Sequence, residues 1–310
     1  MAFLNINATL PEKGRDLRLD LFRGIANWAI FLDHIPDNVV NWITTRNYGF
    51  SDAADLFVFI SGYTASFVYA RMMLERGTVI GATRLIKRAW QIYVAHVLLF
   101  VFYAAAIGYV AQRYGDSHLL DEFNVAGLIE QPVATLTQGL MLKFKPLNLD
   151  VLPLYIVLMA GFPPLLIVMM RWPNAALAAS ISVYLSARLF GWNFTAYPSG
   201  GWYFNPFAWQ FLFVIGAWVA VGGATAARAL INSKTTLAVA GLFLLFAAFI
   251  TLATRTGHQN LILDTVRSTF IPNDKTNLAL YRIVHFLAVA IVISRLIPKD
   301  APFLSTSWLR

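Results

Sequence analysis

The feature that most constrains this chain is a series of long apolar runs separated by short polar segments. Hydrophobic side chains make up 58% of the 310 residues and charged ones only 13%, whereas a soluble domain carries about 25% charge. A helix that crosses a bilayer needs about 20 mainly apolar residues. We therefore expect an all-α polytopic membrane bundle, built as one domain over residues 1–310. The chain has no cysteine, which excludes disulfides, thiol catalysis and cysteine-ligated metals.

The apolar runs predict about eight transmembrane helices, with boundaries uncertain by a few residues. The runs occupy residues 21–35, 54–73, 89–110, 151–170, 175–190, 206–222, 235–254 and 278–296. Most Lys and Arg residues fall on the cytoplasmic side if the N-terminus is cytoplasmic, and most carboxylates fall on the other side. The net charge of +8 is thus a topology signal, and we expect no nucleic-acid partner. A weakly amphipathic stretch at residues 125–142 is expected to lie along the interface or to re-enter the membrane.

The first apolar run carries the strongest functional signal, because ionisable side chains within a span are functional candidates. Asp20 and Arg23 share a helix face at its inner end, either as a structural ion pair or as part of a site. Asp33 and His34 lie at its outer end, roughly 16 Å from Arg23 along the helix axis. Because carboxylates surround His34, this imidazole is the candidate for proton transfer near neutral pH.

The second apolar run begins with two carboxylates, Asp52 and Asp55, on one helix face. A carboxylate at a helix N-terminus suits the helix dipole, which would explain one of them without any function. Asp55 lies deeper and is the better candidate to orient an imidazole or to accept a sugar hydroxyl. Ser61 and its neighbour Gly62 permit close contact with another helix.

Three basic residues, Arg84, Lys87 and Arg88, precede the third span. They form either an ordinary positive-inside flank or a site for a phosphate-bearing cytoplasmic donor. Further polar or aromatic candidates for a buried site or the acceptor side are Asp150, Trp202, Trp209, Gln210, Arg282 and His285. The tryptophans belong to a segment that resembles an interfacial belt and equally a stacking surface for sugars. No metal-binding spacing, phosphate-binding glycine loop or nucleophile elbow occurs.

Taken in order, these motifs resemble the integral-membrane acyltransferase superfamily, and the fuller pattern is most similar to its OpgC branch. The segments that carry the resemblance are residues 19–24, 31–36, 54–63, 149–155, 205–210 and 281–286, together with the basic group at 84–88. The resemblance implies a bacterial inner-membrane enzyme that transfers succinyl groups from cytoplasmic succinyl-CoA to periplasmic glucans, with no permanently bound cofactor. It implies that His34 is the catalytic base and that the basic group meets the donor. It leaves open whether the enzyme is a homo-oligomer.

Such proteins usually carry about ten spans of about 20 apolar residues each, so we expect this chain to lack the last helix pair, either as a truncated or as a short member. In the predicted reaction, Asp55 or Asp33 holds the His34 imidazole while a glucan hydroxyl attacks the thioester, and transfer is direct. Transfer through an acyl-His or acyl-Ser61 intermediate stays open. The alternative functions are a transporter for a glycan or an acyl carrier, which would explain the same intramembrane charges, and an inert scaffold.

Overall fold

The chain is helical throughout the part that the computed structural model describes, which comprises residues 9–10, 17–298, 301 and 304. No β-strand forms in these residues, and the only β-type contact there is an isolated bridge between Thr195 and Gly201. The end of the chain, to which the expectation of a missing helix pair refers, lies largely outside the described residues. The all-α prediction is confirmed.

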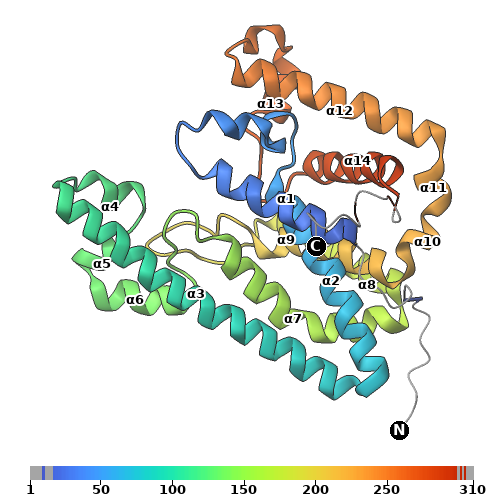
Figure 1. The fold of residues 1–310 in the computed structure, drawn as a ribbon, viewed down its shortest axis with the longest axis horizontal. Helices are drawn as coiled ribbons and strands as arrows, with labels where there is room; N and C mark the ends of the chain where they lie inside the picture. Colours follow the sequence, from blue (N-terminus) through green and yellow to red (C-terminus); the bar gives the residue numbers. More distant parts are fainter. Residues whose placement is uncertain (1–8, 11–16, 299–300, 302–303, 305–310) are drawn as a thin grey trace.

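Each of the eight predicted runs forms a helix (Figure 1). These long helices are α1 (Leu17–Asp33), α2 (Ala53–Arg76), α3 (Thr78–Tyr114), α7 (Val151–Arg171), α8 (Pro173–Phe190), α9 (Pro206–Trp218), α12 (Lys234–Arg255) and α14 (Leu280–Leu296). Shorter elements connect them: η1 (Val39–Ile43), η2 (Thr45–Asn47), α4 (His118–Glu122), α5 (Gly127–Glu130), α6 (Pro132–Leu140), the π-helical turn η3 (Val219–Gly223), α10 (Ala224–Ala226), α11 (Arg228–Asn232), η4 (Gln259–Leu261) and α13 (Asp264–Phe270).

Five helices of the described part are long and apolar enough to cross a membrane: α2, α3, α7, α9 with η3, and α12. Helices α1 and α14 have 17 residues each, or about 26 Å, which is shorter than the hydrocarbon core of about 30 Å. Helix α8 also falls outside this set of five. The eight spans and the cytoplasmic N-terminus therefore stay predictions.

Helix α3 is the longest element, with 37 residues, or about 56 Å. It extends well beyond the apolar run at residues 89–110 in both directions. Its first turns carry the basic group, and its far end carries α4, α5 and α6, which lie together beside it (Figure 1). The predicted amphipathic stretch is thus helical in α5 and α6, with Ile129, Val133 and Leu136 exposed.

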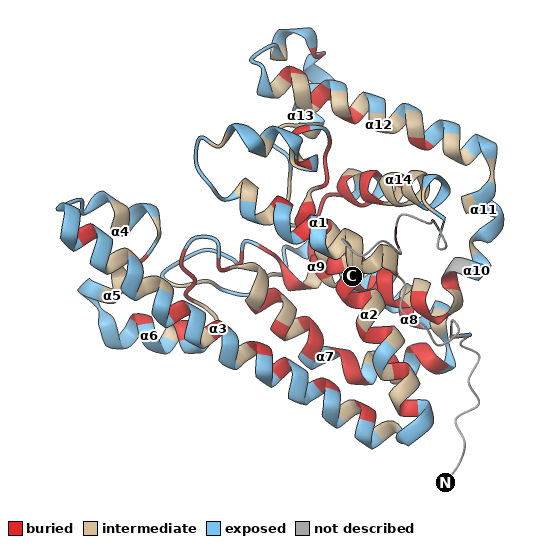
Figure 2. Ribbon diagram, in the orientation of Figure 1, coloured by how far each residue is buried: buried red, intermediate tan, exposed pale blue. Residues whose placement is uncertain are grey.

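The core lies around α2, α9 and α7, whose facing sides are buried, whereas α3 and α12 expose much of their surface (Figure 2). Exposed apolar side chains such as Phe102 on α3 and Leu245 on α12 suit a lipid environment, because lipid removes the penalty for exposing them. We call the end of the bundle where α1 terminates and α2, α7, α9 and α14 begin the His34 end. The opposite end, where α3 begins, is the Arg88 end.

Two glycines allow α2 and α9 to approach to backbone contact. A Cβ on Gly62 would overlap the backbone carbonyl of Phe213, and a Cβ on Gly216 would overlap that of Phe59. Small residues at helix crossings are the usual means by which membrane helices pack closely. The prediction that Gly62 permits close helix contact is confirmed.

Gly62→Ala is expected to separate α2 from α9 and to destabilise the protein by about 1–3 kcal/mol, the usual cost of overpacking. The measurement is the midpoint of thermal unfolding in detergent. Gly108→Ala is the matched control, because Gly108 lies within α3 with open space around its Cβ position. Equal midpoints for the two variants would contradict the packing account.

Candidate active site

His34 lies just after the last turn of α1 and is exposed. Its Nδ1 is 2.6 Å from the carbonyl oxygen of Ile30. Because a carbonyl oxygen only accepts hydrogen bonds, Nδ1 carries the proton in this contact, so that Nε2 is the unprotonated nitrogen whenever the ring is neutral. In its neutral form, His34 would therefore present the lone pair of Nε2, as a general base requires.

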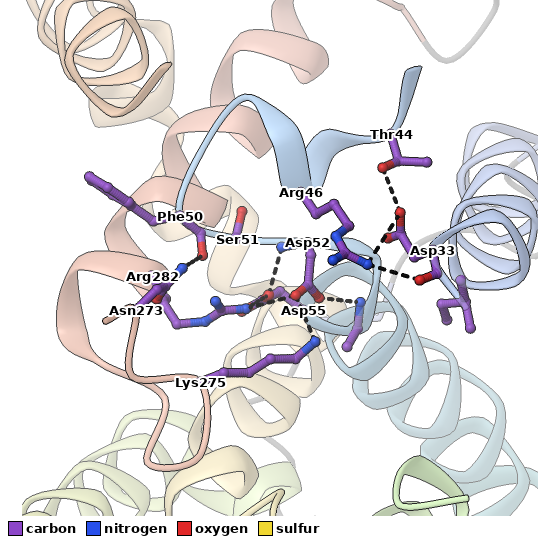
Figure 3. A network of polar contacts seen from close by, with 12 residues as sticks. Asp33, Thr44, Arg46, Phe50, Ser51, Asp52, Asp55, Asn273, Lys275 and Arg282 are labelled. Atoms are coloured by element: carbon purple, nitrogen blue, oxygen red, sulfur yellow. Dashed lines mark hydrogen bonds and ion pairs between the residues drawn. The ribbon is translucent and has the colours of Figure 1, made fainter. Parts of the chain in front are cut away.

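Asp33, the last residue of α1, anchors the loop that follows it (Figure 3). The Thr44 hydroxyl donates to Oδ1 of Asp33 at 2.6 Å, and NH1 of Arg46 lies 3.9 Å from the same oxygen. Arg46 also donates to the Asp33 backbone carbonyl at 2.9 Å. The structure thus corrects the expectation that Asp33 holds the His34 ring: its carboxylate holds η1 and η2, and the ring is held by the Ile30 carbonyl.

Four charged side chains, Asp52, Asp55, Lys275 and Arg282, form a charge centre where α2 begins (Figure 3). Asp52 is the N-cap of α2: its side chain accepts from the Ala54 amide at 2.9 Å. The Asp52 amide in turn donates to Oδ2 of Asp55 at 2.9 Å, completing a capping box. One of the two carboxylates therefore has the purely structural role that the helix dipole suggests.

Arg282 connects this cap to α14. Its NH2 lies 2.5 Å from Oδ2 of Asp55 and 3.3 Å from Oδ2 of Asp52, while Nζ of Lys275 lies 2.7 Å from Oδ2 of Asp52. Burial opposes the ionisation of Asp52, but Lys275 and Arg282 outweigh it and hold the pKa of this carboxyl below its usual range. The charge centre thus ties α2 to α14 and to the loop that precedes it.

Asp55 is fully buried, and no hydrogen bond or ion pair among the described residues joins it to His34. The Asp55 and Arg282 side chains are 0% and 2% exposed, so each supplies the opposite charge that the other needs at that depth. The expectation that Asp55 orients His34 is therefore corrected: its Oδ2 is bound to Arg282. The pairing was missed because the two residues are 227 positions apart. The available signal was that both charges lie in apolar runs and need partners.

His285 is a second, buried histidine beside the charge centre. Its Nδ1 lies 2.7 Å from the Ser51 hydroxyl and 3.3 Å from the Ser51 amide, which donates to it. The other side of the ring faces Gly49, where any Cβ would overlap Nε2. His285 therefore fixes the segment before α2 against α14 and is enclosed by protein.

Lys145, which precedes α7, is a buried cation that the sequence analysis did not single out. It is 8% exposed, and its Nζ lies 3.9 Å from the centroid of the Trp202 ring. Burial lowers the pKa of Lys145 to about 8, against an opposing effect of Asp150. Burial raises the pKa of Asp150, while Lys145 and His34 act in the other direction. Asp150 is thus a carboxylate whose charge reaches both His34 and Lys145.

The two predicted acceptor-side tryptophans are enclosed. Trp202 is 3% and Trp209 0% exposed, and Nε1 of Trp209 donates to the Lys275 carbonyl at 3.0 Å. Neither ring offers a free face for stacking a sugar, which corrects that expectation. Gln210 joins α9 to α8 by bonds of 2.6 and 2.9 Å to the Ser180 hydroxyl and carbonyl, so its polar group is satisfied within the bundle.

The Arg88 end gathers part of the predicted donor site. Arg23 donates to the Thr64 hydroxyl at 2.7 Å and lies 3.7 Å from Asp20. Tyr155 shares a hydrogen bond with Ser61, and the charges of both Arg23 and Arg88 reach its phenol. Arg23 and Arg88 therefore both act electrostatically on one phenol, which lies in the first turns of α7.

Arg84 and Lys87 lie on the exposed surface of the first turns of α3, on the same helix as Arg88. A pocket of about 470 Å³ opens elsewhere, where α7, α8 and η3 meet, and Arg171, Trp172 and Trp218 line it. His34 is not among its lining residues. Among the described residues, no three His, Asp or Glu side chains group in a way that could hold a metal ion.

Comparison with known proteins gives one match. The family model described as OpgC protein matches residues 15–310, which is nearly the whole chain. No curated protein and no solved structure matches the chain.

A double-mutant cycle tests the charge centre. Arg282→Met leaves Asp55 buried without the guanidinium that it binds and is expected to cost about 3–5 kcal/mol of stability. Adding Asp55→Leu removes that uncompensated charge, so the double variant is expected to be more stable than Arg282→Met alone. Thermal unfolding in detergent measures both.

The control for this cycle is the exposed pair of Arg267 and Asp264, whose side chains are 44% and 89% exposed. Arg267→Met is expected to change stability little, because exposed ion pairs contribute about 0–1 kcal/mol. A strictly additive cycle at Asp55 and Arg282 would show that the two side chains do not stabilise each other.

Proposed function

This chain belongs to the OpgC family, and on that premise we propose that it is a membrane acyltransferase that esterifies hydroxyl groups of a glucan. We further propose that the acyl group is succinyl, that the donor is succinyl-CoA on the cytoplasmic side, and that the acceptor is a periplasmic glucan. The family match supports the acyltransferase class, and the five apolar helices support a multi-pass membrane protein. A bacterial inner membrane with a cytoplasmic N-terminus is the location that fits both substrates.

The observation that carries this proposal is the hydrogen bond from Nδ1 of His34 to the Ile30 carbonyl at 2.6 Å. In the neutral ring it leaves Nε2 unprotonated, and His34 is exposed just after the end of α1, where an acceptor can reach it. A backbone carbonyl takes the orienting role that a carboxylate plays in other base-catalysed acyl transfers. The charge of Asp150 acts on the same imidazole and would stabilise the imidazolium formed during the reaction.

The donor would enter from the Arg88 end. Phosphate groups bind best to guanidinium groups, and Arg88, Arg84 and Lys87 lie on the exposed start of α3. Arg23 lies farther inside, roughly 16 Å from His34 along the axis of α1. The pantetheine arm of a coenzyme A thioester is long and narrow enough to span such a distance, so the two ends of the bundle need not come together.

In the reaction that we propose, Nε2 of His34 accepts the proton of a glucan hydroxyl. The hydroxyl oxygen forms a bond to the thioester carbonyl carbon, and the carbon–sulfur bond breaks. The departing thiolate takes the proton back from the imidazolium, so that the products are the glucan ester and the free thiol of coenzyme A. No covalent enzyme intermediate is required, and His34 ends each cycle in its starting tautomer.

His34→Ala is expected to lower acyl transfer by about 100-fold to 10,000-fold, the usual contribution of a general base. Purified protein is incubated with labelled succinyl-CoA and glucan, and ester formation is measured. His258→Ala is the matched control, because His258 is another exposed histidine and follows α12. Full ester formation by a folded His34→Ala protein would refute the assignment, and label crossing a vesicle without ester formation would indicate a transporter.

Arg88→Gln is expected to raise KM for the coenzyme A donor by about tenfold, because a lost charge-assisted hydrogen bond is worth about 1.5–3 kcal/mol, and to change kcat less. Arg113→Gln is the matched control at the other end of the same helix. A change in kcat alone would place Arg88 outside the donor site.

A further inference from the structure

Lys145 is the exception to a rule that the other fully buried charges obey. The charged side chains among the buried polar residues of the described part are Asp55, Lys145 and Arg282. Asp55 and Arg282 are bound to each other at 2.5 Å, whereas no described carboxylate lies within 4 Å of the Lys145 ammonium. An ammonium taken out of water without an opposite charge is costly. The burial of Lys145 without a carboxylate partner therefore points to an anionic ligand.

The hydrogen-bonding capacity of Lys145 is largely unused. Its ammonium has three donors, and its one hydrogen bond with the described residues is a long contact of 3.4 Å to the Leu142 carbonyl. Below it lies the Trp202 ring, whose buried Nε1 has no hydrogen-bond partner. The charge of Lys145 also reaches His96, whose buried Nδ1 has no partner either. These unpartnered groups gather in one region and suit a ligand that brings acceptor oxygens.

This region lies at the His34 end of the bundle, just before α7 begins. Asp150 lies close enough to interact electrostatically with both Lys145 and His34. Arg46, Lys275 and the more exposed Arg188 at this end have carboxylate partners, which are Asp33, Asp52 and Asp274 in turn. Partly buried Lys143, like Lys145, has no carboxylate partner among the described residues. Lys145 differs from Lys143 in being buried, and it is therefore the buried cation here that can take an additional anion without giving up a bound carboxylate.

We propose that Lys145 binds the free carboxylate of a dicarboxylic acyl group while His34 promotes transfer of its other end. This inference rests on the proposed acyltransferase function and adds a selectivity determinant to it. A succinyl group has its thioester carbonyl at one end and a carboxylate at the other, separated by two methylene groups. With the thioester at His34, the carboxylate needs a cation a few ångströms away, on the same side of the bundle.

The physical consequence is discrimination by charge. A carboxylate beside Lys145 favours the protonated ammonium, which burial otherwise weakens. A butyryl group has the same chain length but ends in a methyl group, so it would leave the ammonium unpaired. The site would thus select dicarboxylic acyl groups partly by penalising neutral ones.

The experiment compares two donors, succinyl-CoA and butyryl-CoA, on the full-length protein in detergent. Lys145→Met is expected to lower kcat/KM for succinyl-CoA by about 100-fold, typical of removing one partner of a buried charge pair. It should leave kcat/KM for butyryl-CoA unchanged or higher, while Lys145→Arg retains part of the preference for succinyl. Lys143→Met, two residues away in the same loop, is the matched control and should change neither value.

Equal losses with both donors would show that Lys145 has a structural or proton-transfer role, and an unchanged preference would place the carboxylate elsewhere. Either result overturns the inference while the acyltransferase function stands. A binding measurement tests whether the anion site exists even if the protein is not an acyltransferase. Free succinate or butyrate is added and tryptophan fluorescence is recorded, since Trp202 lies against Lys145. If succinate binds only when Lys145 is present, but the protein transfers neither acyl group, the anion site stands and the acyltransferase function is refuted. Failure of succinate to bind would refute the site.

Discussion

The need to pair every charge that is taken out of water governs this structure. Five helices of the described part are apolar enough to cross a membrane, and a charge within such a bundle is stable only beside a partner or in contact with water. Asp55 and Arg282 satisfy this need for each other across α2 and α14. The same contact orders the start of α2, because Asp55 also accepts from the Asp52 amide. One ion pair therefore places the helix that follows the His34 loop, and so it contributes indirectly to the position of the candidate base.

The helices of this fold were predictable because the apolar runs in the sequence are long. All eight runs form helices. The sixth was expected over residues 206–222; α9 covers Pro206–Trp218, and η3 continues it to Gly223 with a kink at Val221 and Gly222. Hydropathy reports where lipid can surround a helix, which differs from where the helix begins or ends. Helix α3 is therefore much longer than its apolar run, since Arg84 and Arg113 continue it into polar surroundings at little cost.

The sequence allowed most residues of the candidate site to be predicted, but few of the contacts between them. Spacing along one helix reveals neighbours three or four residues apart, and it gave the pair of Asp20 and Arg23. It cannot reveal that Asp55 meets Arg282, because the bundle brings together positions that the chain separates widely. Lys145 was missed for a different reason: it lies between spans, where a lysine is ordinary, and only its burial makes it unusual.

The contacts divide the charged residues into two groups with different consequences. Asp33, Asp52 and Asp55 bind a loop, a helix cap and a buried guanidinium, so all three carboxylates have structural roles. Oδ1 of Asp55 has no hydrogen-bond partner among the described residues, but this side chain is 0% exposed. His34 and Lys145 have hydrogen-bonding groups that the fold does not use. In His34 this is Nε2, and in Lys145 it is the ammonium, which has no carboxylate partner among the described residues. A fold can tolerate such incompletely bonded groups where substrate completes them. Substrate is therefore expected to bind where polar side chains lack partners within the fold. This reasoning favours His34 and Lys145 over the more numerous carboxylates around them.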